Sequence, residues 1–230
     1  MKGDKTGFRI YVKEGTPLNT NHKEAYKEVG LEVGKKANLT GVAKARDWMC
    51  ANFFDVRTFG AVMSTGDNCG QVRGPIQINF SRSIDPIVQQ EVTITRQTVT
   101  REEEAEKERT MGRKHIVPYG LYKVEGYISA KLANDETKGT GFSEEDLELF
   151  WKALEEMFEH DHSAARGKMA AQKLFIFKHN DELGNAPSHK LFDMIKVEKK
   201  EAVVIPRKFA DYDVAVEGKT PEGVTLIEKL

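Results

Sequence analysis

Apolar residues recur every three or four positions between Thr40 and Met63, which is the spacing of one buried helix face. The apolar members of this run are Val42, Ala45, Trp48, Met49, Phe53, Val56 and Phe59. Thr40 has the side chain of a helix N-cap, and a break in the helix is expected near Asn52–Asp55. The pattern therefore predicts a packed helix in two pieces, preceded by a weaker helix over residues 22–29.

A second amphipathic pattern begins at Ser143, with Asp146 three residues later as a capping box requires. Its apolar stripe consists of Leu147, Phe150, Trp151, Leu154 and Phe158. Glutamates occupy the opposite face, which is the arrangement of a helix with one face in water. The sequence therefore predicts a long helix from Ser143.

Alternating apolar and polar residues predict the strands. Ile76, Ile78 and Phe80 alternate with polar residues, and a longer alternating run extends from Leu121 to Leu132. Residues 174–177 (LFIF) are apolar on both faces, which is typical of a central strand. Shorter strands are expected at residues 8–12, 194–197, 203–205, 213–216 and 224–227.

An unusual segment lies between residues 91 and 119. Val92–Val99 alternates like a strand, five glutamates follow between residues 102 and 108, and Arg109, Arg113, Lys114 and His115 come next. The segment holds few large apolar residues, so it cannot bury much surface of its own. It is predicted to be a β-rich arm that projects from the core and returns at Pro118-Tyr119-Gly120.

The predicted order is strand, helix, strand, arm, strand, helix, strand, which is an α+β arrangement. This βαββαβ order is that of a ferredoxin-like palm, the scaffold that RNA-recognition domains also use. The first strand is the weak element, because Phe8–Val12 is its only candidate and lies far from the helix that it should precede.

Charge is unevenly distributed along the 230 residues, although the net charge is −1. Residues 1–131 carry a balance of +5 (21 Lys and Arg, 16 Asp and Glu), and residues 132–230 carry −6 (14 and 20). Seven of the eleven arginines lie between Arg57 and Arg113, a stretch with Lys107 as its single lysine. Arginine grips phosphate through two parallel hydrogen bonds, so the segregation suggests one phosphate-binding face. Chance, together with ion pairs to residues 102–108, is the alternative.

Composition excludes several classes of protein. The chain is 39% hydrophobic and 31% charged, so it can form a core, and its apolar runs are shorter than a membrane span. Cys50 and Cys69 are its two cysteines, which excludes a disulfide framework. No secretory signal is visible, so we expect a cytoplasmic protein that does not associate with membranes.

Several long segments carry a resemblance to a known family. They are residues 57–63 (RTFGAVM), 70–77 (GQVRGPIQ), 108–122 (ERTMGRKHIVPYGLY), 157–167 (MFEHDHSAARG), 178–179 (KH) and 183–187 (LGNAP). Together they resemble the repeating backbone subunit of the type I-C CRISPR surveillance complex (Cascade).

The resemblance implies a non-catalytic protein that binds crRNA through an RNA-recognition-like palm and an inserted β-hairpin thumb. Copies would stack head to tail along the guide spacer, beside other Cascade subunits, and leave bases free to pair with target DNA in antiviral defence. It implies one domain over residues 1–230, with a helical insertion at about 22–63 and a thumb at about 91–119. Family members begin with a strand and a basic helix, and MKGDKTG stands here instead, so both are expected to be missing.

Nine residues are the candidates for RNA contact: Arg57, Gln71, Arg73, Gln77, Arg82, Arg96, Arg113, Lys114 and His115. Arg57, Gln71, Arg73 and Gln77 match the family segment that borders the RNA path. For each cation a surface ion pair is the alternative, for the glutamines a solvated strand face, and for His115 a hydrogen bond to the Pro118 turn. Arg101 and Arg109 flank the glutamates and are expected to pair with them.

Two other functional classes compete with RNA binding. His160-Asp161-His162 has the side chains of a metal-dependent phosphohydrolase or RNA nuclease, but such sites need further His and Asp ligands, and the triplet follows a helix whose dipole favours cationic histidine. A structural filament protein that never touches RNA is the third class. We expect no enzyme activity, no metal and no cofactor.

Overall fold

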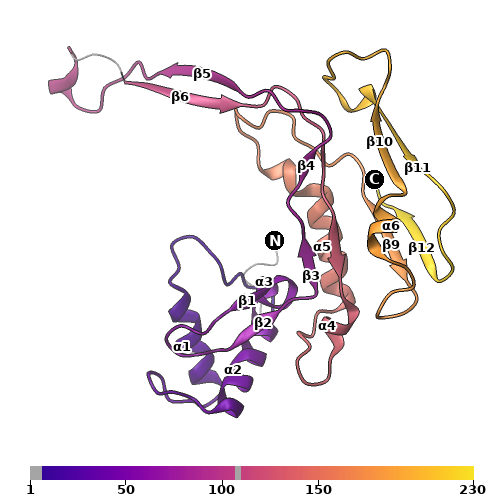
Figure 1. Cartoon of the computed structure of the whole chain (residues 1–230). Coiled ribbons are helices and arrows are strands. Elements are labelled where there is room, and N and C mark those ends of the chain that lie inside the picture. The colour runs from indigo at the N-terminus through magenta and orange to yellow at the C-terminus, as the bar shows by residue number, and fades with distance from the viewer. Residues whose placement is uncertain (1–6, 107–109) are drawn as a thin grey trace. The chain divides into compact units, whose positions relative to one another are not determined.

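The computed structural model describes residues 7–106 and 110–230, in which helices and short strand pairs are mixed (Figure 1). This confirms the predicted α+β class. The described residues fall into two compact units. The first comprises residues up to Asn79 together with Glu125–Lys152 and His179–Asn185, and the second comprises Phe80–Val124, Ala153–Lys178 and Ala186–Leu230.

Three helices begin the first unit: α1 (Leu18–Glu28), α2 (Leu39–Asn52) and α3 (Phe54–Phe59). The predicted break in the second helix is confirmed, because Phe53 takes extended dihedral angles between α2 and α3. The N-cap is Asn38, whose side chain accepts a hydrogen bond from Gly41 N at 2.8 Å, so the prediction of Thr40 was wrong by two residues. The weak helix is α1, which begins four residues earlier than predicted.

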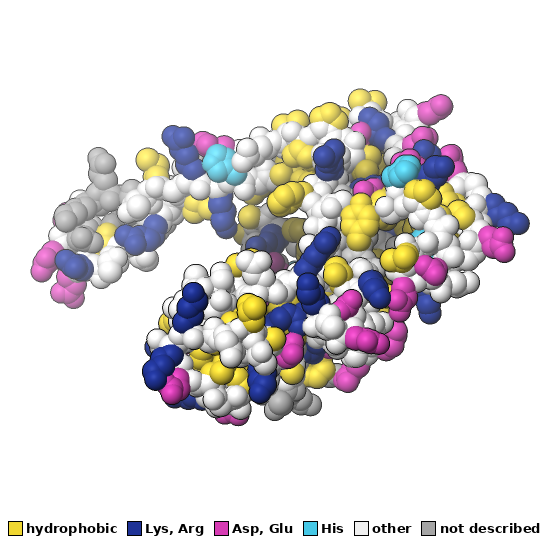
Figure 2. All heavy atoms as spheres, turned by 60° about the horizontal axis from the view of Figure 1, so that its bottom comes forward, with side chains coloured by type: hydrophobic (Ala, Val, Ile, Leu, Met, Phe, Trp, Pro, Cys, Tyr) yellow, Lys and Arg dark blue, Asp and Glu magenta, His cyan; other side chains and the backbone are white. Residues whose placement is uncertain are grey.

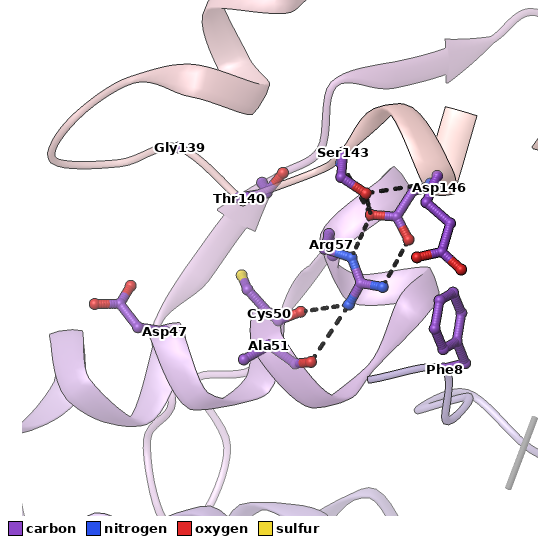
Figure 3. A pocket seen from close by; sticks show the side chains of 11 residues that line it. Phe8, Asp47, Cys50, Ala51, Arg57, Gly139, Thr140, Ser143 and Asp146 are labelled. Atoms are coloured by element: carbon purple, nitrogen blue, oxygen red, sulfur yellow. Dashed lines mark hydrogen bonds and ion pairs between the residues drawn. The ribbon is translucent and has the colours of Figure 1, made fainter. Parts of the chain in front are cut away.

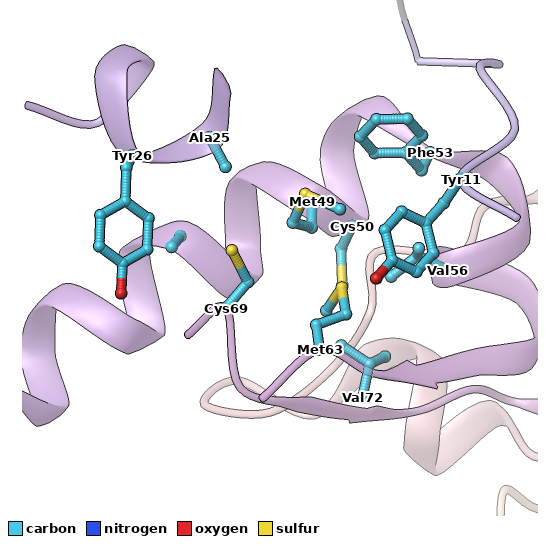
Figure 4. Close-up of a cluster of buried hydrophobic side chains, with 11 residues drawn as sticks. Tyr11, Ala25, Tyr26, Met49, Cys50, Phe53, Val56, Met63, Cys69 and Val72 are labelled. Carbon is cyan, nitrogen blue, oxygen red and sulfur yellow. The ribbon is translucent and has the colours of Figure 1, made fainter. Parts of the chain in front are cut away.

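The core of the first unit lies between α1, α2 and the antiparallel pair β1 (Gly60–Val62) and β2 (Gln71–Arg73). Figure 4 shows Met49 of α2, Met63 just after β1 and Val72 of β2 in one buried cluster. Tyr11 joins this cluster from the N-terminal segment. The predicted strand at Phe8–Val12 is absent, since Arg9 makes an isolated bridge to Phe53 and the segment is otherwise irregular.

Two glycines allow the chain to pass very close to itself at the end of α3. Gly60 has φ +86°, and a Cβ added there would lie 2.3 Å from Val72 O. A Cβ on Gly74 would lie 2.4 Å from Gly60 N and 2.4 Å from Thr58 O. No side chain fits at either position, so these glycines are what allow β2 to turn into the next strand against α3.

The first unit continues through β3 (Ile76–Ile78), β8 (Gly126–Ile128), α4 (Ala130–Asn134) and α5 (Glu144–Glu156), whose last residues belong to the second unit. β3 and β8 pair antiparallel, with Gln77 opposite Tyr127. The capping box of α5 is confirmed, because Ser143 N donates to Asp146 Oδ2 at 2.9 Å and Asp146 N donates to Ser143 Oγ at 3.3 Å.

The predicted long strand over residues 121–132 was wrong. It is divided into β7 (Tyr122–Lys123) and β8, and its last residues form α4. The Ser129 hydroxyl accepts a hydrogen bond from Leu132 N at 3.3 Å and so begins a helix where the alternating pattern suggested continued extension.

The second unit carries a long antiparallel hairpin of β5 (Gln90–Thr95) and β6 (Met111–Ile116), with a 3₁₀ turn at Glu102–Glu104 (Figure 1). All six residues of β5 are exposed, as are the first five of β6. This hairpin confirms the predicted β-rich arm. Its base continues into β4 (Arg82–Ser83), which pairs with β7.

The rest of the second unit contains the pairs β9 (Phe175–His179) with β12 (Val224–Glu228) and β10 (Ile195–Lys199) with β11 (Tyr212–Val216). Short helical segments lie at Met157–His160, Ser188–Phe192 (α6) and Phe209–Asp211. The strand predicted at residues 203–205 is absent, because Val203 N donates to Lys200 O in a turn and Pro206 follows.

Every sheet formed by the described residues has two strands. The LFIF segment is therefore not a central strand, since β9 pairs with β12 alone and its residues are only half-buried. The four-stranded sheet of a ferredoxin-like palm is not seen among residues 7–106 and 110–230. The single-domain boundaries and the 22–63 insertion stay predictions.

Candidate nucleic-acid interface

Arg57 lies in the interior of the first unit and not on a surface that RNA could reach. Its side chain is 8% exposed and forms an ion pair with Asp146, whose side chain is 3% exposed. Nε donates to Asp146 Oδ2 at 2.9 Å and Nη2 donates to Asp146 Oδ1 at 2.8 Å (Figure 3). Nη2 also donates to Gly7 O at 2.7 Å, and Nη1 donates to the carbonyls of Cys50 and Ala51 at 2.9 and 3.5 Å.

These bonds use all five N–H groups of the guanidinium, and the rings of Phe8 and Phe54 each lie 5.7 Å from its central carbon. A phosphate would find no donor free, so the prediction that Arg57 contacts RNA was wrong. Burial raises the pKa of Asp146, but hydrogen bonds from Arg57 and Ser143 outweigh burial and leave the pKa below its usual value. The pair is thus fully ionised and structural.

A cavity of roughly 500 Å³ lies beside this ion pair, within the first unit. Its lining includes the carboxylates of Asp47, Glu145 and Asp146, together with Phe8 and Thr140 (Figure 3). The one basic side chain among the lining residues is Arg57, whose N–H groups are already used, so this lining offers no cation to a phosphate backbone. The cavity is therefore not part of the candidate interface.

Gln71 and Arg73 remain candidates on the surface of the first unit. They are the exposed ends of β2 on either side of buried Val72, so both project from the same face of the strand. Gln77 is also exposed, but its Nε2 donates to the carbonyls of Phe59 and Gly74, each at 3.3 Å. Only its amide oxygen is left to accept a hydrogen bond from a ribose hydroxyl.

Arg82 lies in the second unit, at the base of the hairpin. It is exposed in β4 and stands directly opposite Lys123 in the antiparallel register with β7. Lys123 donates from Nζ to Phe192 O at 3.3 Å. The register thus places two basic side chains opposite each other at the base of the hairpin.

Four candidates lie on the hairpin, and its register divides them between two faces. Arg113 and His115 share one face with Met111 and Glu91, whereas Lys114 and Arg96 share the other with the apolar residues Val92 and Ile94. Figure 2 shows basic side chains along the hairpin and acidic ones gathered near its tip. The hairpin therefore presents cations on both of its faces.

The two faces differ in how freely their charges can reach an anion. On the first face, Glu91 Oε1 lies 3.5 Å from Arg113 Nη1, and Glu91 Oε2 lies 3.8 Å from His115 Nε2. These pairs are exposed, so each is weak and can be exchanged for a phosphate. On the second face, Arg96 N donates to Thr110 O at 2.9 Å, which continues the backbone ladder one residue beyond β5.

Lys123 is the candidate that sequence reasoning missed. Lys123 lies in the alternating run that begins at Leu121, and the strand register places it opposite Arg82. The alternation did indicate a strand, but no sequence pattern states which residue of another strand will be its partner. Arg109, which was expected to pair with the acidic turn, lies outside the described residues.

The His160-Asp161-His162 triplet is exposed where the helical segment Met157–His160 ends. The Asp161 carboxylate is paired with Arg166. Within residues 7–106 and 110–230, no group of three or more His, Cys, Asp or Glu side chains is placed to hold a metal ion. None of the helices described there has the length and apolarity needed to cross a bilayer.

Comparison with known proteins identifies the family. The family model of CRISPR-associated protein Cas7 matches residues 1–217, which is most of the chain. A search among curated proteins finds no match. The family supports a role as a backbone subunit of a CRISPR Cascade complex, with crRNA and other Cascade subunits as partners. The chain belongs to the family of CRISPR-associated protein Cas7.

Proposed function

We propose that this chain is the repeating, non-catalytic backbone subunit of a type I-C Cascade complex. Copies polymerise head to tail along the crRNA spacer, grip its sugar-phosphate backbone and leave its bases free to pair with target DNA. Gln71 and Arg73 on β2, the Arg82–Lys123 pair and the hairpin cations are the phosphate contacts. Sequence is then read by base pairing and not by the protein.

One observation supports this proposal most strongly, namely the exposed hairpin β5–β6. It carries Arg96, Arg113 and Lys114 on a ribbon that buries almost none of its own surface. Such a ribbon gains little from ordering unless something packs against it, because fixing each residue costs roughly 1–2 kcal/mol of conformational entropy. A polyanion with exposed bases is a partner that matches both its cations and its apolar face.

The salt dependence of RNA binding tests the proposal. Log affinity for a single strand falls with log salt by about 0.7 for each phosphate neutralised. We expect a steep slope for the unaltered chain, and a slope lower by about 1.4 for Arg73→Ala combined with Lys114→Ala. The matched control is Arg166→Ala with Lys173→Ala, which removes the same charge from residues already paired with Asp161 and Glu228.

Three outcomes are distinguished by this experiment. A flat slope for the unaltered chain would favour a filament protein that does not touch RNA. An equal change in the test and control variants would mean that only net charge matters. A change in the test variant alone supports the proposed contacts.

The proposed lack of catalysis is tested by adding Mn²⁺ and Zn²⁺ to the chain with labelled single-stranded RNA. We expect the RNA to remain intact, because the described residues around His160 supply too few ligands. Metal-dependent cleavage that His160→Ala abolishes would instead support the nuclease alternative.

A further inference from the structure

The hairpin is joined to the rest of the second unit by an irregular neck. The pairing of β4 with β7 ends with Ile84 N donating to Leu121 O at 2.8 Å, and the β5–β6 ladder begins only at Gln90 opposite Ile116. Pro86 and Pro118 lie between these two ladders and have no N–H to donate. Among the described residues of the neck, no backbone hydrogen bond joins its two segments between these ladders.

Tyr212 contacts both chains of this neck. Its hydroxyl donates to Asp85 Oδ2 at 2.5 Å on the outgoing chain. Its ring stacks on Tyr119 of the returning chain, with centroids 6.5 Å apart and planes 25° apart. Tyr212 is only 5% exposed, whereas Asp85 and Tyr119 are each partly exposed.

Tyr212 is itself held firmly. It is the first residue of β11 and stands opposite Lys199 in the β10–β11 ladder. Burial raises the pKa of Tyr212, and the hydrogen bond to Asp85 raises it further, so the hydroxyl keeps its proton and remains a donor at neutral pH. The neck is thus tied to an ordered sheet through one side chain.

We propose that Tyr212 is a positioning residue that sets the direction of the RNA-binding hairpin by clamping Asp85 and Tyr119 across the neck. The RNA-binding part of this inference rests on the proposed function, whereas the clamp does not. Each hairpin strand has six paired residues, which makes the ribbon about 20 Å long. A small rotation at the neck is therefore amplified at the hairpin cations, which must meet phosphates at set positions.

The alternative is that Tyr212 merely stabilises the second unit, and a distance measurement separates the two roles. Spin labels are placed at Thr98→Cys, beyond the hairpin strands, and at Glu217→Cys, beside β11; both positions are exposed. The native thiols do not compete for label, because burial raises the pKa of Cys50 to about 11 and that of Cys69 to about 12. Pulsed electron paramagnetic resonance then reports the spread of hairpin directions without RNA.

Tyr212→Phe keeps the ring and removes only the hydroxyl. We expect its distance distribution to be clearly broader than that of the unaltered chain, while the urea midpoint of β10–β11 unfolding changes little. Tyr122→Phe is the matched control, because Tyr122 lies beside the neck in β7 and is 49% exposed. Its distribution should equal that of the unaltered chain.

A second variant keeps the inference testable if Tyr212→Phe fails to fold. Asp85→Ala removes the acceptor from the neck and leaves β11 intact, so it should broaden the distribution to the same degree. Asp85→Asn retains an acceptor oxygen and should restore a narrow distribution. A narrow distribution in both Tyr212→Phe and Asp85→Ala would overturn the clamp.

RNA affinity is measured on the same variants. We expect Tyr212→Phe to bind single-stranded RNA about threefold to tenfold more weakly, the range that one hydrogen bond's net contribution allows, with an unchanged salt slope. A broader distribution together with no RNA binding by the unaltered chain would contradict the proposed function and leave the clamp standing. Broadening without any loss of RNA affinity would confine Tyr212 to a structural role.

Discussion

Arg57 and Asp146 lie 89 residues apart in the chain and form a two-point ion pair inside the first unit. Asp146 is also the capping residue of α5, through its bonds to Ser143. One carboxylate thus begins a helix and holds α3 against it. Because the buried Asp146 carboxylate holds its guanidinium, Arg57 is absent from the surface, although it belongs to the arginine-rich stretch of the sequence.

Breaking this pair should destabilise the protein and not merely weaken RNA binding. Arg57→Ala leaves Asp146 ionised and buried without its partner, which typically costs about 3–5 kcal/mol. Urea denaturation should show that loss, and Arg73→Ala should change stability by less than about 0.5 kcal/mol because its side chain is exposed. Equal stability of the two variants would mean that the ion pair is not formed in solution.

Gly74 should be far less tolerant of substitution than Gly112. Gly74→Ala places a Cβ within 2.4 Å of backbone atoms of Thr58, Phe59 and Gly60, which cannot move aside without disturbing the β1–β2 pairing at Gly60. Nothing lies within 4 Å of a Cβ added at Gly112 on the hairpin. Thermal unfolding should therefore show a large drop for Gly74→Ala and a near-native midpoint for Gly112→Ala. A native thermal unfolding midpoint for both Gly74→Ala and Gly112→Ala would contradict the close approach of the chain at Gly60.

His22 should make the protein less stable in mild acid. It is fully buried, its Nδ1 lies 3.0 Å from Thr65 O, and its Nε2 lies 2.7 Å from the hydroxyl of Tyr11. The carbonyl can only accept, so Nδ1 carries the proton and Nε2 accepts from Tyr11. Burial lowers the pKa of His22, against a smaller opposing effect of the Thr65 carbonyl and of Asp67.

The unfolded chain therefore binds a proton at His22 near pH 6.5 that the folded chain does not bind. The free energy of unfolding should be unaffected by His22 above that pH and should fall as the pH drops from about 6.5 towards the folded-state pKa. Urea midpoints between pH 8 and pH 5 measure this. His22→Gln should reduce the fall, whereas His189→Gln, on an exposed turn of α6, should keep it.

Glu91 should restrain RNA binding, because its carboxylate lies against both Arg113 and His115. Glu91→Gln frees the Arg113 guanidinium and removes one negative charge from the hairpin, so the salt slope should steepen by about 0.7 and affinity at low salt should rise. Glu198→Gln removes the same charge from exposed β10 and serves as the control. Unchanged binding by Glu91→Gln would exclude its face of the hairpin from the interface.

The hairpin was predictable from sequence because its signal is local. Alternation over Val92–Val99, a lack of large apolar residues and a charged turn together specify an exposed ribbon. The helix at Ser143 was predictable for the same reason, since its cap and stripe lie within a few turns of one another.

The errors arose where distant partners decide the outcome. Arg57 was assigned to RNA because nothing near it in the sequence reveals Asp146 as its partner. The run from Leu121 to Leu132 alternates throughout, but Ser129 caps a helix inside it. Lys123 was overlooked because its place opposite Arg82 depends on strand register, which alternation alone does not define.

The proposed polymerisation along a guide is tested most directly by weighing complexes on RNA of increasing length. Single-stranded RNAs of several lengths and unrelated sequences are mixed with the chain, and the mass of each complex is measured by single-molecule light scattering. We predict that mass rises with RNA length in steps of one subunit, 25.9 kDa, whatever the sequence. A single bound copy at every length, or binding that depends on sequence, would contradict a backbone subunit that lies along its guide.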